Sequence, residues 1–483
     1  MVAVKPKMKN RRILIFLIPV LIINIILYFH VFSYGFVFDD WHLIREYSYK
    51  ELTSSFKGSW SGNSLTPNYF RPFFIVYNYF TYKLWGADAF AYHAANIITH
   101  IANIVTIFFI MYYILTKIKK NAAIATSIFS IIPYVAMPVS FISDIGTPLS
   151  FFFFGLSFLL FLIYNDFRNN DSAKRIAVLT FSYLSFLIGL LVKELTATLP
   201  LIITLYTLVY FGKKRDKWKN TAGYWIIFVV YFIYRSFALK GLGLSSFTYG
   251  TNFLQDIFIK IATFMANSFF MIIPFAEIEV PFWFYAVDLL FVAVLVFNLI
   301  KLIFSKNTQK SEKMKIYFFL GWTIICLLPT YASLGARLLY YAGVGFSALV
   351  FLVSINIITR FKEAKQKKKF QDKVMTGVSI AVIFLFLIIS LYGNITYQRD
   401  YRPDSKFALS RDIYAYKTQY LKGLLMPEQG MLLTEKLQSY GIVENGVINE
   451  NKVVNDDRKT LRRFITKFVV SKINVQNVHE YNI

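Results

Sequence analysis

The feature that most constrains this chain is a repeated pattern of apolar runs, most of them close to twenty residues long. A helix of that length crosses the hydrocarbon core of a bilayer. The chain is 56% hydrophobic and only 16% charged, and a soluble fold of 483 residues could not bury that much apolar surface. The runs are 13–32, 89–116, 121–139, 147–165, 176–192, 195–211, 221–238, 257–275, 281–300, 316–331, 339–359 and 376–394. The sequence therefore predicts an all-α polytopic membrane protein.

The net charge of +25 has to be interpreted with this pattern in mind. In a soluble protein it would suggest nucleic acid as a partner. Here the Lys and Arg residues form short clusters between apolar runs, as in membrane proteins that orient by the positive-inside rule. We therefore expect membrane lipids and no nucleic acid as partners. The single cysteine, Cys326, excludes a disulfide within the chain and a cysteine-based metal site.

The basic clusters also predict the topology. They are 117–120, 168–175, 213–219, 301–315 and 360–373, and each should be cytoplasmic. If every run crossed, the last two clusters would lie outside. The run 257–275 contains Lys260, Asn267 and Pro274, so we expect it to stay at the outer interface as an amphipathic or re-entrant helix. About eleven spans result, with outer interfacial helices.

This topology divides the chain into two regions. Residues 1–395 form the transmembrane domain, and residues 34–88 are its first external loop. The run 13–32 is followed by Phe32–Phe36 and not by a small-residue cleavage site, so it should be a retained helix with a cytoplasmic N-terminus. The polar residues 396–483 should form a small extracytoplasmic C-terminal region with a mixed α/β pattern.

Two adjacent carboxylates, Asp39 and Asp40, begin the first external loop. The charges of two neighbouring carboxylates repel each other, so their pKa values move apart and one of them can stay ionised as a general base at neutral pH. A divalent cation, Mg²⁺ or Mn²⁺, is a second role that adjacent carboxylates suit. A helix cap or an ion pair at the membrane boundary is the structural alternative. We favour Asp39 as base with Asp40 as its orienting or metal-binding neighbour, although the order could be reversed.

Four cations fall near outer helix ends and are candidates to bind a phosphate. Arg71 precedes Pro72, which can start a helix at 72–85, and an extended Arg71 would leave its guanidinium free for a bidentate contact. Lys193 lies in a Lys-Glu pair that interrupts an apolar stretch, with Glu194 expected to orient it. Arg235 and Arg337 complete the set. Interfacial snorkelling and a surface ion pair are the alternatives.

One polar stripe lies within the second predicted span. His93, Asn96, His100 and Asn103 follow spacings of three and four, so they share one helix face that must meet protein or water. Two histidines seven residues apart are too far along a helix to share one metal ion. We expect the stripe to join helices, with His93 near its outer end as a supporting member of the site. Asp144, in a short external turn, is a second supporting candidate.

Taken in order, these motifs resemble those of the GT-C polytopic membrane glycosyltransferases. The segments that carry the resemblance are Phe38-Asp39-Asp40, Phe70-Arg71-Pro72, His93 to His100, Lys193-Glu194 with Pro200, and Ala336 to Tyr340. They are most similar to the branch of protein O-mannosyltransferases and tetratricopeptide-bearing transmembrane O-mannosyltransferases. The resemblance covers about residues 13–360. Two features depart from that branch: Ser143 to Thr147 stands where a Gly-Arg-x-Asp-type turn is usual, and 396–483 shows no tetratricopeptide period.

The resemblance implies a polyprenyl-phosphate-linked sugar donor, an inverting transfer to an acceptor hydroxyl on the extracytoplasmic side, and a first-loop acid as base. The acceptor is left open between protein, lipid and glycan. A surface-polysaccharide polymerase or ligase is an alternative, although many of those carry their large external loop late in the chain. A lipid-linked-sugar flippase or transporter is the non-enzyme alternative, and it should show repeats or charges at mid-membrane.

Overall fold

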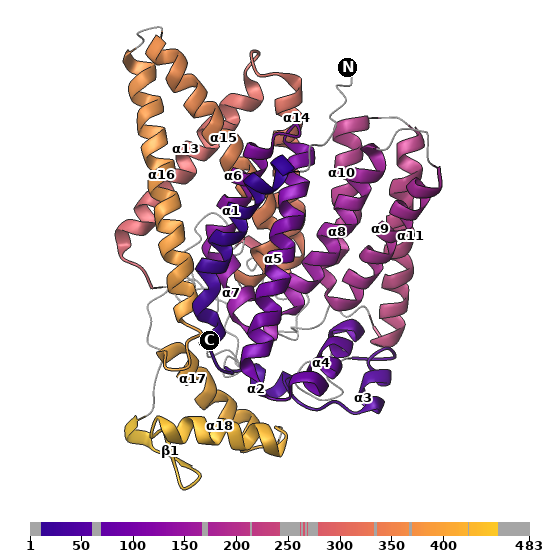
Figure 1. The fold of residues 1–483 in the computed structure, drawn as a ribbon, viewed down its shortest axis with the longest axis vertical. Coiled ribbons are helices and arrows are strands. Elements are labelled where there is room, and N and C mark those ends of the chain that lie inside the picture. Colours follow the sequence, from indigo (N-terminus) through magenta and orange to yellow (C-terminus); the bar gives the residue numbers. More distant parts are fainter. Residues whose placement is uncertain are drawn as a thin grey trace.

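The computed structural model describes residues 11–59, 69–166, 172–212, 215–241, 261, 264–265, 268, 279–332, 336–366, 370–423 and 425–452. Long helices form one bundle, and short helices gather at one of its ends (Figure 1). The long helices are α1 (Arg11–Tyr28), α5 (Ala89–Ile114), α8 (Gly146–Asp166), α9 (Ser172–Val192), α10 (Leu199–Phe211), α11 (Arg215–Ala238), α13 (Phe282–Phe304), α14 (Lys310–Leu327), α15 (Tyr340–Gln366) and α16 (Phe370–Arg399).

Shorter elements connect and cap the bundle. They are η1 (Phe29–Ser33), α2 (Asp40–Leu43), α3 (Tyr49–Ser54), α4 (Pro72–Trp85), α6 (Lys119–Ile131), α7 (Pro133–Ser140), η2 (Ile142–Asp144), η3 (Glu194–Thr198), η4 (Leu328–Ala332) and η5 (Ala336–Leu339). The C-terminal elements are α17 (Lys406–Ala415), the π-helical turn η6 (Tyr416–Tyr420), α18 (Pro427–Ser439), the paired strands β1 (Val443–Glu444) and β2 (Val447–Ile448), and η7 (Glu450–Lys452).

The chain is a polytopic all-α membrane protein, as the apolar runs predict. Within the described ranges, nine helices are long and apolar enough to cross a membrane, and the pair α6–α7 is a tenth such segment if it is one span. The predicted run 316–331 lies mostly in α14, whose first turns carry Lys310, Glu312, Lys313 and Lys315. Its apolar part alone is shorter than a bilayer is thick. The prediction for 257–275 falls on residues that, apart from a few isolated positions, lie outside the described ranges.

The predicted run 121–139 is not one straight helix. It forms α6 and α7, which meet at a bend of 70°. Pro133 begins α7 and has no N–H to continue the ladder, and Ile132 before it is extended with ψ of 132°. The bend directs the end of α7 toward the turn that carries Asp144.

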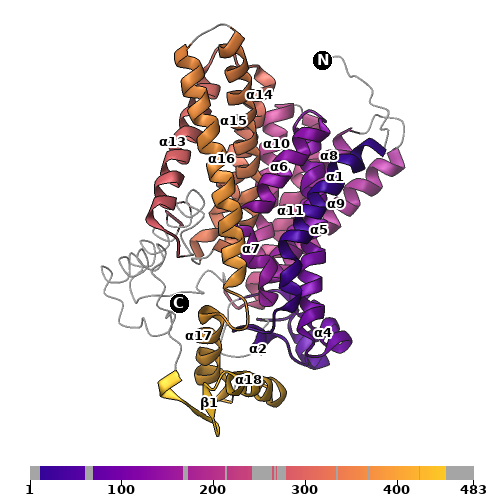
Figure 2. The same ribbon diagram turned by 60° about the vertical axis from the view of Figure 1, so that its left-hand side comes forward.

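The two ends of the bundle differ in the residues they gather. At one end, Lys117 pairs with Asp166, and Lys217 donates to Asn165, so these two lysines lie together at the end of α8. At the other end, the hydroxyl of Tyr234 in α11 donates to the carbonyl of Phe56 in the first loop. Helix α1 begins near the basic end, whereas α2 to α4, α17 and α18 lie at the opposite end (Figures 1 and 2).

The polar stripe on α5 joins helices as predicted. His100 contacts the Tyr340 hydroxyl at 2.8 Å and the Asn24 side-chain oxygen at 3.0 Å, and so links α1, α5 and α15. Asn103 donates to the carbonyl of Pro148 in α8 at 2.8 Å. Because no water is present in hydrocarbon, these buried groups need such partners from other helices.

The C-terminal elements α17 and α18, with the strands that follow, pack on the first loop instead of standing apart (Figure 2). We call residues 400–452 the C-terminal cap. One apolar cluster contains Phe36, Trp41 and Ile44 from the first loop, Tyr92 from α5, and Leu409, Ile413, Leu433 and Leu437 from the cap. The cap therefore rests on the loop that holds the two candidate acids.

Candidate active site

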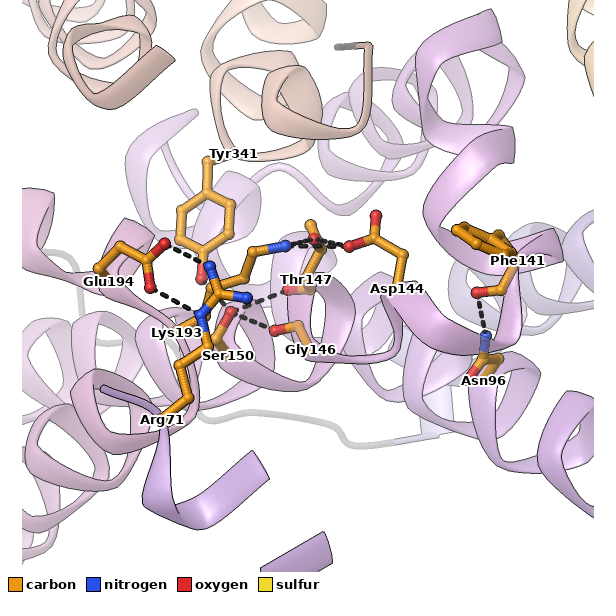
Figure 3. A network of polar contacts seen from close by, with 10 residues as sticks. All are labelled: Arg71, Asn96, Phe141, Asp144, Gly146, Thr147, Ser150, Lys193, Glu194 and Tyr341. Carbon is orange, nitrogen blue, oxygen red and sulfur yellow. Dashed lines mark hydrogen bonds and ion pairs between the residues drawn. The ribbon is translucent and has the colours of Figure 1, made fainter. Parts of the chain in front are cut away.

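Five turns at the end opposite the basic clusters supply charged side chains. These turns follow η1, precede α4, connect α7 to α8, connect α9 to η3, and form η5. The charged residues in them are Asp39, Asp40, Arg71, Asp144, Lys193, Glu194 and Arg337. Figure 3 shows the central part of the network, from Glu194 and Arg71 to Asp144. Apart from Arg235 and His93, every predicted site residue comes from these turns.

Asp40 is saturated with hydrogen bonds. Its Oδ2 accepts from the backbone N–H of Val37 at 2.9 Å, and its Oδ1 accepts from the backbone N–H of Ser143 at 2.8 Å and from the Ser143 hydroxyl. The side chain is 1% exposed. Burial raises the pKa of Asp40 to about 7, although the bonds from Ser143 and Val37 oppose the rise. Asp40 thus ties the first loop to the turn before α8.

Asp39 has a different environment from its neighbour. Its carboxylate accepts no hydrogen bond from the residues the structure describes, and the residue is partly exposed. Burial raises the pKa of Asp39, Arg337 and Arg411 oppose the rise, and Asp144 adds to it. An accessible carboxylate without a fixed donor can accept a proton from a ligand.

Lys193 and Asp144 form a buried pair. The Lys193 ammonium lies 2.9 Å from Oδ1 of Asp144 and also contacts the Thr147 hydroxyl, which donates to the same carboxylate at 2.7 Å (Figure 3). Side-chain exposures of 7% and 3% show that the pair is buried. Oδ2 of Asp144 has no hydrogen-bond partner among the described residues. Lys193 is therefore held in place and partly neutralised.

Arg71 pairs with Glu194, which differs from the prediction that Glu194 orients Lys193. The guanidinium makes a fork with both carboxylate oxygens, with Nε to Oε2 at 2.8 Å (Figure 3). The ring of Tyr69 lies 4.2 Å from the Arg71 Cζ. Glu194 follows Lys193 directly, but the chain at η3 turns the two side chains toward different partners. The pairing anchors the segment before α4 to η3.

Among the predicted cations, Arg337 differs in its surroundings from Arg71 and Lys193, which are both in ion pairs. It makes no hydrogen bond or ion pair with the described residues, and it is partly exposed in η5. Its charge interacts with Asp144 and Asp39. Of the four predicted cations, it is the one with the most freedom to bind an external anion.

The remaining two predicted residues lie at the margin. Arg235 is partly buried in the last turn of α11, and Tyr231, one turn earlier, is within electrostatic reach of Glu194, Arg71 and Arg235. His93 is buried on α5 with its ring 6.1 Å from that of Tyr34. None of its described contacts is with the charged residues of the site, so it supports the start of the first loop.

Neutral side chains fix the turns that carry these charges. Asn96 of the α5 stripe donates to the Phe141 carbonyl at 3.0 Å, just before Asp144 (Figure 3). The Tyr341 hydroxyl donates to Ser150 Oγ at 2.8 Å, and Ser150 donates to the Gly146 carbonyl at 2.6 Å. The stripe that joins helices thus also positions the acidic turn.

The described residues do not fit a metal ion at Asp39 and Asp40. Within that part of the chain, no group of three or more His, Cys, Asp or Glu side chains could hold one. Both oxygens of Asp40 point at N–H donors, which a cation would have to displace. Arg337 and Arg411 already supply positive charge beside Asp39.

Sequence reasoning missed Arg411. It belongs to α17 of the C-terminal cap, and its Cζ lies 5.3 Å from the centres of both the Phe38 and Phe407 rings. The separation of more than 370 residues from Asp39 gave no sign of this proximity. A basic-acidic pair, Arg411-Asp412, between apolar cap residues was the available signal.

Comparisons with known proteins support the fold. The structure is similar to that of the archaeal oligosaccharyltransferase AglB from Archaeoglobus fulgidus in complex with an inhibitory peptide and a dolichol-phosphate. The TM-score is 0.51 at 13% identity, over 97% of this chain and 69% of that chain. It also matches ArnT from Cupriavidus metallidurans bound to undecaprenyl phosphate, with a TM-score of 0.41 at 12% identity, over 86% of this chain and 82% of that chain.

At the level of sequence, no family model matches the chain, and neither does any curated protein. The similarity to AglB supports the predicted all-α polytopic fold, and the predicted resemblance to the GT-C superfamily is taken up as a proposal below. The narrower O-mannosyltransferase branch stays a prediction. The chain is an integral membrane protein that shares its fold with AglB.

Proposed function

We propose that this protein is a membrane glycosyltransferase. It takes a sugar from a polyprenyl-phosphate-linked donor and transfers it, with inversion, to an acceptor hydroxyl on the extracytoplasmic side. AglB, which shares the fold, was solved with a dolichol-phosphate and a peptide, and ArnT with undecaprenyl phosphate. Those ligands support a lipid-phosphate donor for this chain as well.

The observation that carries the proposal is the pairing pattern of the charged residues. Arg71 forms an ion pair with Glu194, and Lys193 forms one with Asp144, so these four charges compensate one another in pairs. Asp39 and Arg337 do not pair with described residues, yet each lies within the other's electrostatic field. A base and a cation that no described residue neutralises suit a reaction that releases a proton at one atom and negative charge at another.

The roles follow from the bonds that change. The acceptor O–H gives its proton to the Asp39 carboxylate while its oxygen forms a bond to the anomeric carbon. The bond from that carbon to the phosphate oxygen breaks on the opposite face, and its electron pair stays on the phosphate. Attack from the face opposite the leaving group inverts the anomeric centre. The products are the glycosylated acceptor and polyprenyl phosphate.

Arg337 stabilises the charge that develops on the phosphate. The leaving group needs positive charge and not a proton, and a guanidinium supplies two parallel donors to phosphate oxygens. Lys193, held between Asp144 and Thr147, adds a fixed positive charge behind the site. Asp40 and Glu194 hold the turns that carry Asp39 and Arg71.

The orientation belongs to the same proposal. The basic segments lie at one end of the bundle and the charged site at the other, and basic loops stay cytoplasmic. We infer that the N-terminus is cytoplasmic and that the site and the C-terminal cap face outward. An extracytoplasmic site fits a lipid-borne donor.

The decisive experiment supplies the purified protein with a panel of polyprenyl-phosphate sugars and measures which is consumed. We expect at least one to be consumed. Asp39→Asn should lower turnover by about 10²–10⁴-fold, the range over which a positioned base acts. Arg337→Gln should lower it by roughly 10²-fold, because one charge-stabilising group is lost.

The matched control is Asp166→Asn, which removes a carboxylate at the opposite end of the bundle. It should leave turnover unchanged. Full turnover in Asp39→Asn would remove the base assignment. A protein that consumes no donor but moves lipid across vesicles would be a flippase, and the proposal would fail.

A further inference from the structure

The loop that carries Asp39 is held in an unusual backbone conformation. Phe38, directly before Asp39, has a φ of 54°, in the left-handed region that a bulky residue rarely occupies. For an L-residue, this region is unfavourable because Cβ comes close to the following carbonyl oxygen. The surrounding structure must therefore fix this residue by contacts that an extended loop would lack.

Those contacts come from the C-terminal cap. Oδ1 of Asp412 accepts from the Phe38 backbone N–H at 3.0 Å and from the Trp41 indole N–H at 2.8 Å. The two donors lie on either side of Asp39 and Asp40. A single buried carboxylate oxygen thus brackets the candidate base, although it lies 371 residues from Trp41 in the sequence.

A second cap residue, Lys436, also holds the first loop, and we call the contacts of Asp412 and Lys436 with that loop the clamp. Lys436 of α18 donates to Oδ2 of Asp412 at 2.5 Å and to the Phe36 carbonyl at 2.9 Å. Asp412 is fully buried, and Lys436 neutralises it. Burial raises the pKa of Asp412, and Lys436 is the first of the groups that oppose the rise. Asp412 and Lys436 therefore hold the first loop through hydrogen bonds to Phe36, Phe38 and Trp41.

We propose that Asp412, supported by Lys436, is the positioning residue for the base of this glycosyltransferase. The C-terminal cap then belongs to the site, because it fixes the position of Asp39. Asp412 acts through Phe38 and Trp41 and touches no reacting atom. This inference rests on the proposed function, because positioning has a kinetic meaning only if Asp39 is the base.

The kinetic test uses Asp412→Leu, which has the same number and branching of side-chain heavy atoms but no acceptor. Released from the clamp, Phe38 can leave the left-handed region, and Asp39 moves relative to the acceptor. Misplacement by about 1 Å costs roughly 10²-fold in rate, so kcat should fall by that order. The KM for the donor should stay near the wild-type value, because Arg337 and Lys193 are untouched.

Two further variants separate positioning from folding. The pair Asp412→Asn with Lys436→Gln keeps an oxygen acceptor toward Phe38 and Trp41 and removes both charges together. It should restore kcat well above that of Asp412→Leu. Asp404→Asn changes an exposed cap carboxylate that pairs with Arg402, and it should match wild type.

A labelling measurement tests the loop without relying on catalysis. Asp39→Cys introduces a thiol into a chain whose single native cysteine, Cys326, is buried. A water-soluble maleimide should react with that thiol faster when Asp412→Leu is added, and at an unchanged rate when Asp404→Asn is added. Local release of the loop exposes the side chain.

The two readouts distinguish the possible failures. A wild-type protein that consumes no donor, combined with faster labelling in Asp412→Leu, would reject the proposed function and keep the clamp. Equal labelling with and without Asp412→Leu would overturn the clamp, whatever happens to kcat. So would a loss of kcat that the Asp412→Asn and Lys436→Gln pair fails to relieve.

Discussion

Asp39 and Asp40 are adjacent and chemically identical, and the fold gives them different surroundings. Asp40 accepts from Val37 and Ser143 and so closes the first loop onto the turn before α8. Asp39 accepts from no described residue and lies in the field of Arg337 and Arg411. The sequence alone could not predict which of the two adjacent residues would be hydrogen-bonded and which would not. The partners of Asp40 include Ser143, which is 103 residues away.

The pH dependence of transfer follows from the pKa of Asp39. In the proposed mechanism Asp39 must be ionised to accept the proton, so the rate should fall as pH drops through that pKa. Because the folded-state pKa is raised, the acid limb should lie above the ordinary carboxyl value of about 4. Arg411→Gln removes a cation that lowers this pKa, so the limb should move to higher pH.

A profile of kcat/KM against pH measures this shift. Lys406→Gln is the control, because it removes the same charge from an exposed position on the same helix, α17. Its acid limb should coincide with that of wild type. An Arg411→Gln limb that stays in place or moves to lower pH would contradict the assignment of Asp39.

The structural role of Asp40 predicts a loss of stability. Asp40→Ala leaves the N–H groups of Val37 and Ser143 without their acceptor, which costs about 1–3 kcal/mol in a buried setting. Unfolding of the detergent-solubilised protein, followed by heat or denaturant, measures the difference. Asp166→Ala removes an exposed, paired carboxylate and should cost less than about 1 kcal/mol. Equal losses in both variants would argue against the anchoring role.

Among the elements, α15 packs so closely on α14 that one position tolerates only glycine. A Cβ at Gly345 would lie 2.7 Å from the Phe319 carbonyl oxygen and 2.5 Å from Thr323 Oγ1. Close approach through small residues is a general way for membrane helices to associate. The carbonyl belongs to the backbone of α14 and cannot turn aside as a side chain could.

Gly345→Val should therefore separate the two helices and destabilise the protein by about 1–3 kcal/mol through overpacking. Gly377→Val is the matched control, because a Cβ there would meet only the Phe361 ring at an ordinary 3.6 Å. Both changes place a β-branched residue in a helix, so their backbone effects cancel. Thermal unfolding should show a lower midpoint for Gly345→Val alone.

The elements were also the most predictable part of the molecule. The helix expected at 72–85 has those bounds, because Pro72 starts it and Gly86 ends it with a φ of 54°. The spacing of the α5 stripe predicted its contacts with other helices. The break between α6 and α7 was not predicted, because hydropathy alone does not distinguish a straight apolar run from one bent at Pro133.

At the scale of the whole molecule, the two ends of the bundle should face opposite sides of the membrane. Lys50→Cys introduces an exposed thiol at the site end, and Asn307→Cys introduces one at the basic end. A membrane-impermeant maleimide should label the first in intact cells and the second only after permeabilisation. Labelling in the reverse order would invert the proposed topology.

The same scale shows where sequence reasoning stops. The apolar runs, the basic clusters and the number of crossings between those clusters predict a polytopic helical bundle. They can do so because bilayer thickness and loop charge constrain each segment by itself. The pairing of Arg71 with Glu194, and the clamp of Asp412 on Phe38, depend on how distant segments pack. No local sequence pattern around Asp412 predicts that its hydrogen-bond partners, Phe38 and Trp41, lie in the first loop.

The central claim is that Asp39 takes the proton in transfer from a lipid-phosphate donor. It is tested most directly by measuring donor binding and sugar transfer side by side in Asp39→Asn. The amide keeps the size of the side chain and cannot act as a base. We predict that this variant binds the donor as wild type does and transfers its sugar about 10²–10⁴ times more slowly. Transfer at the wild-type rate would contradict the account.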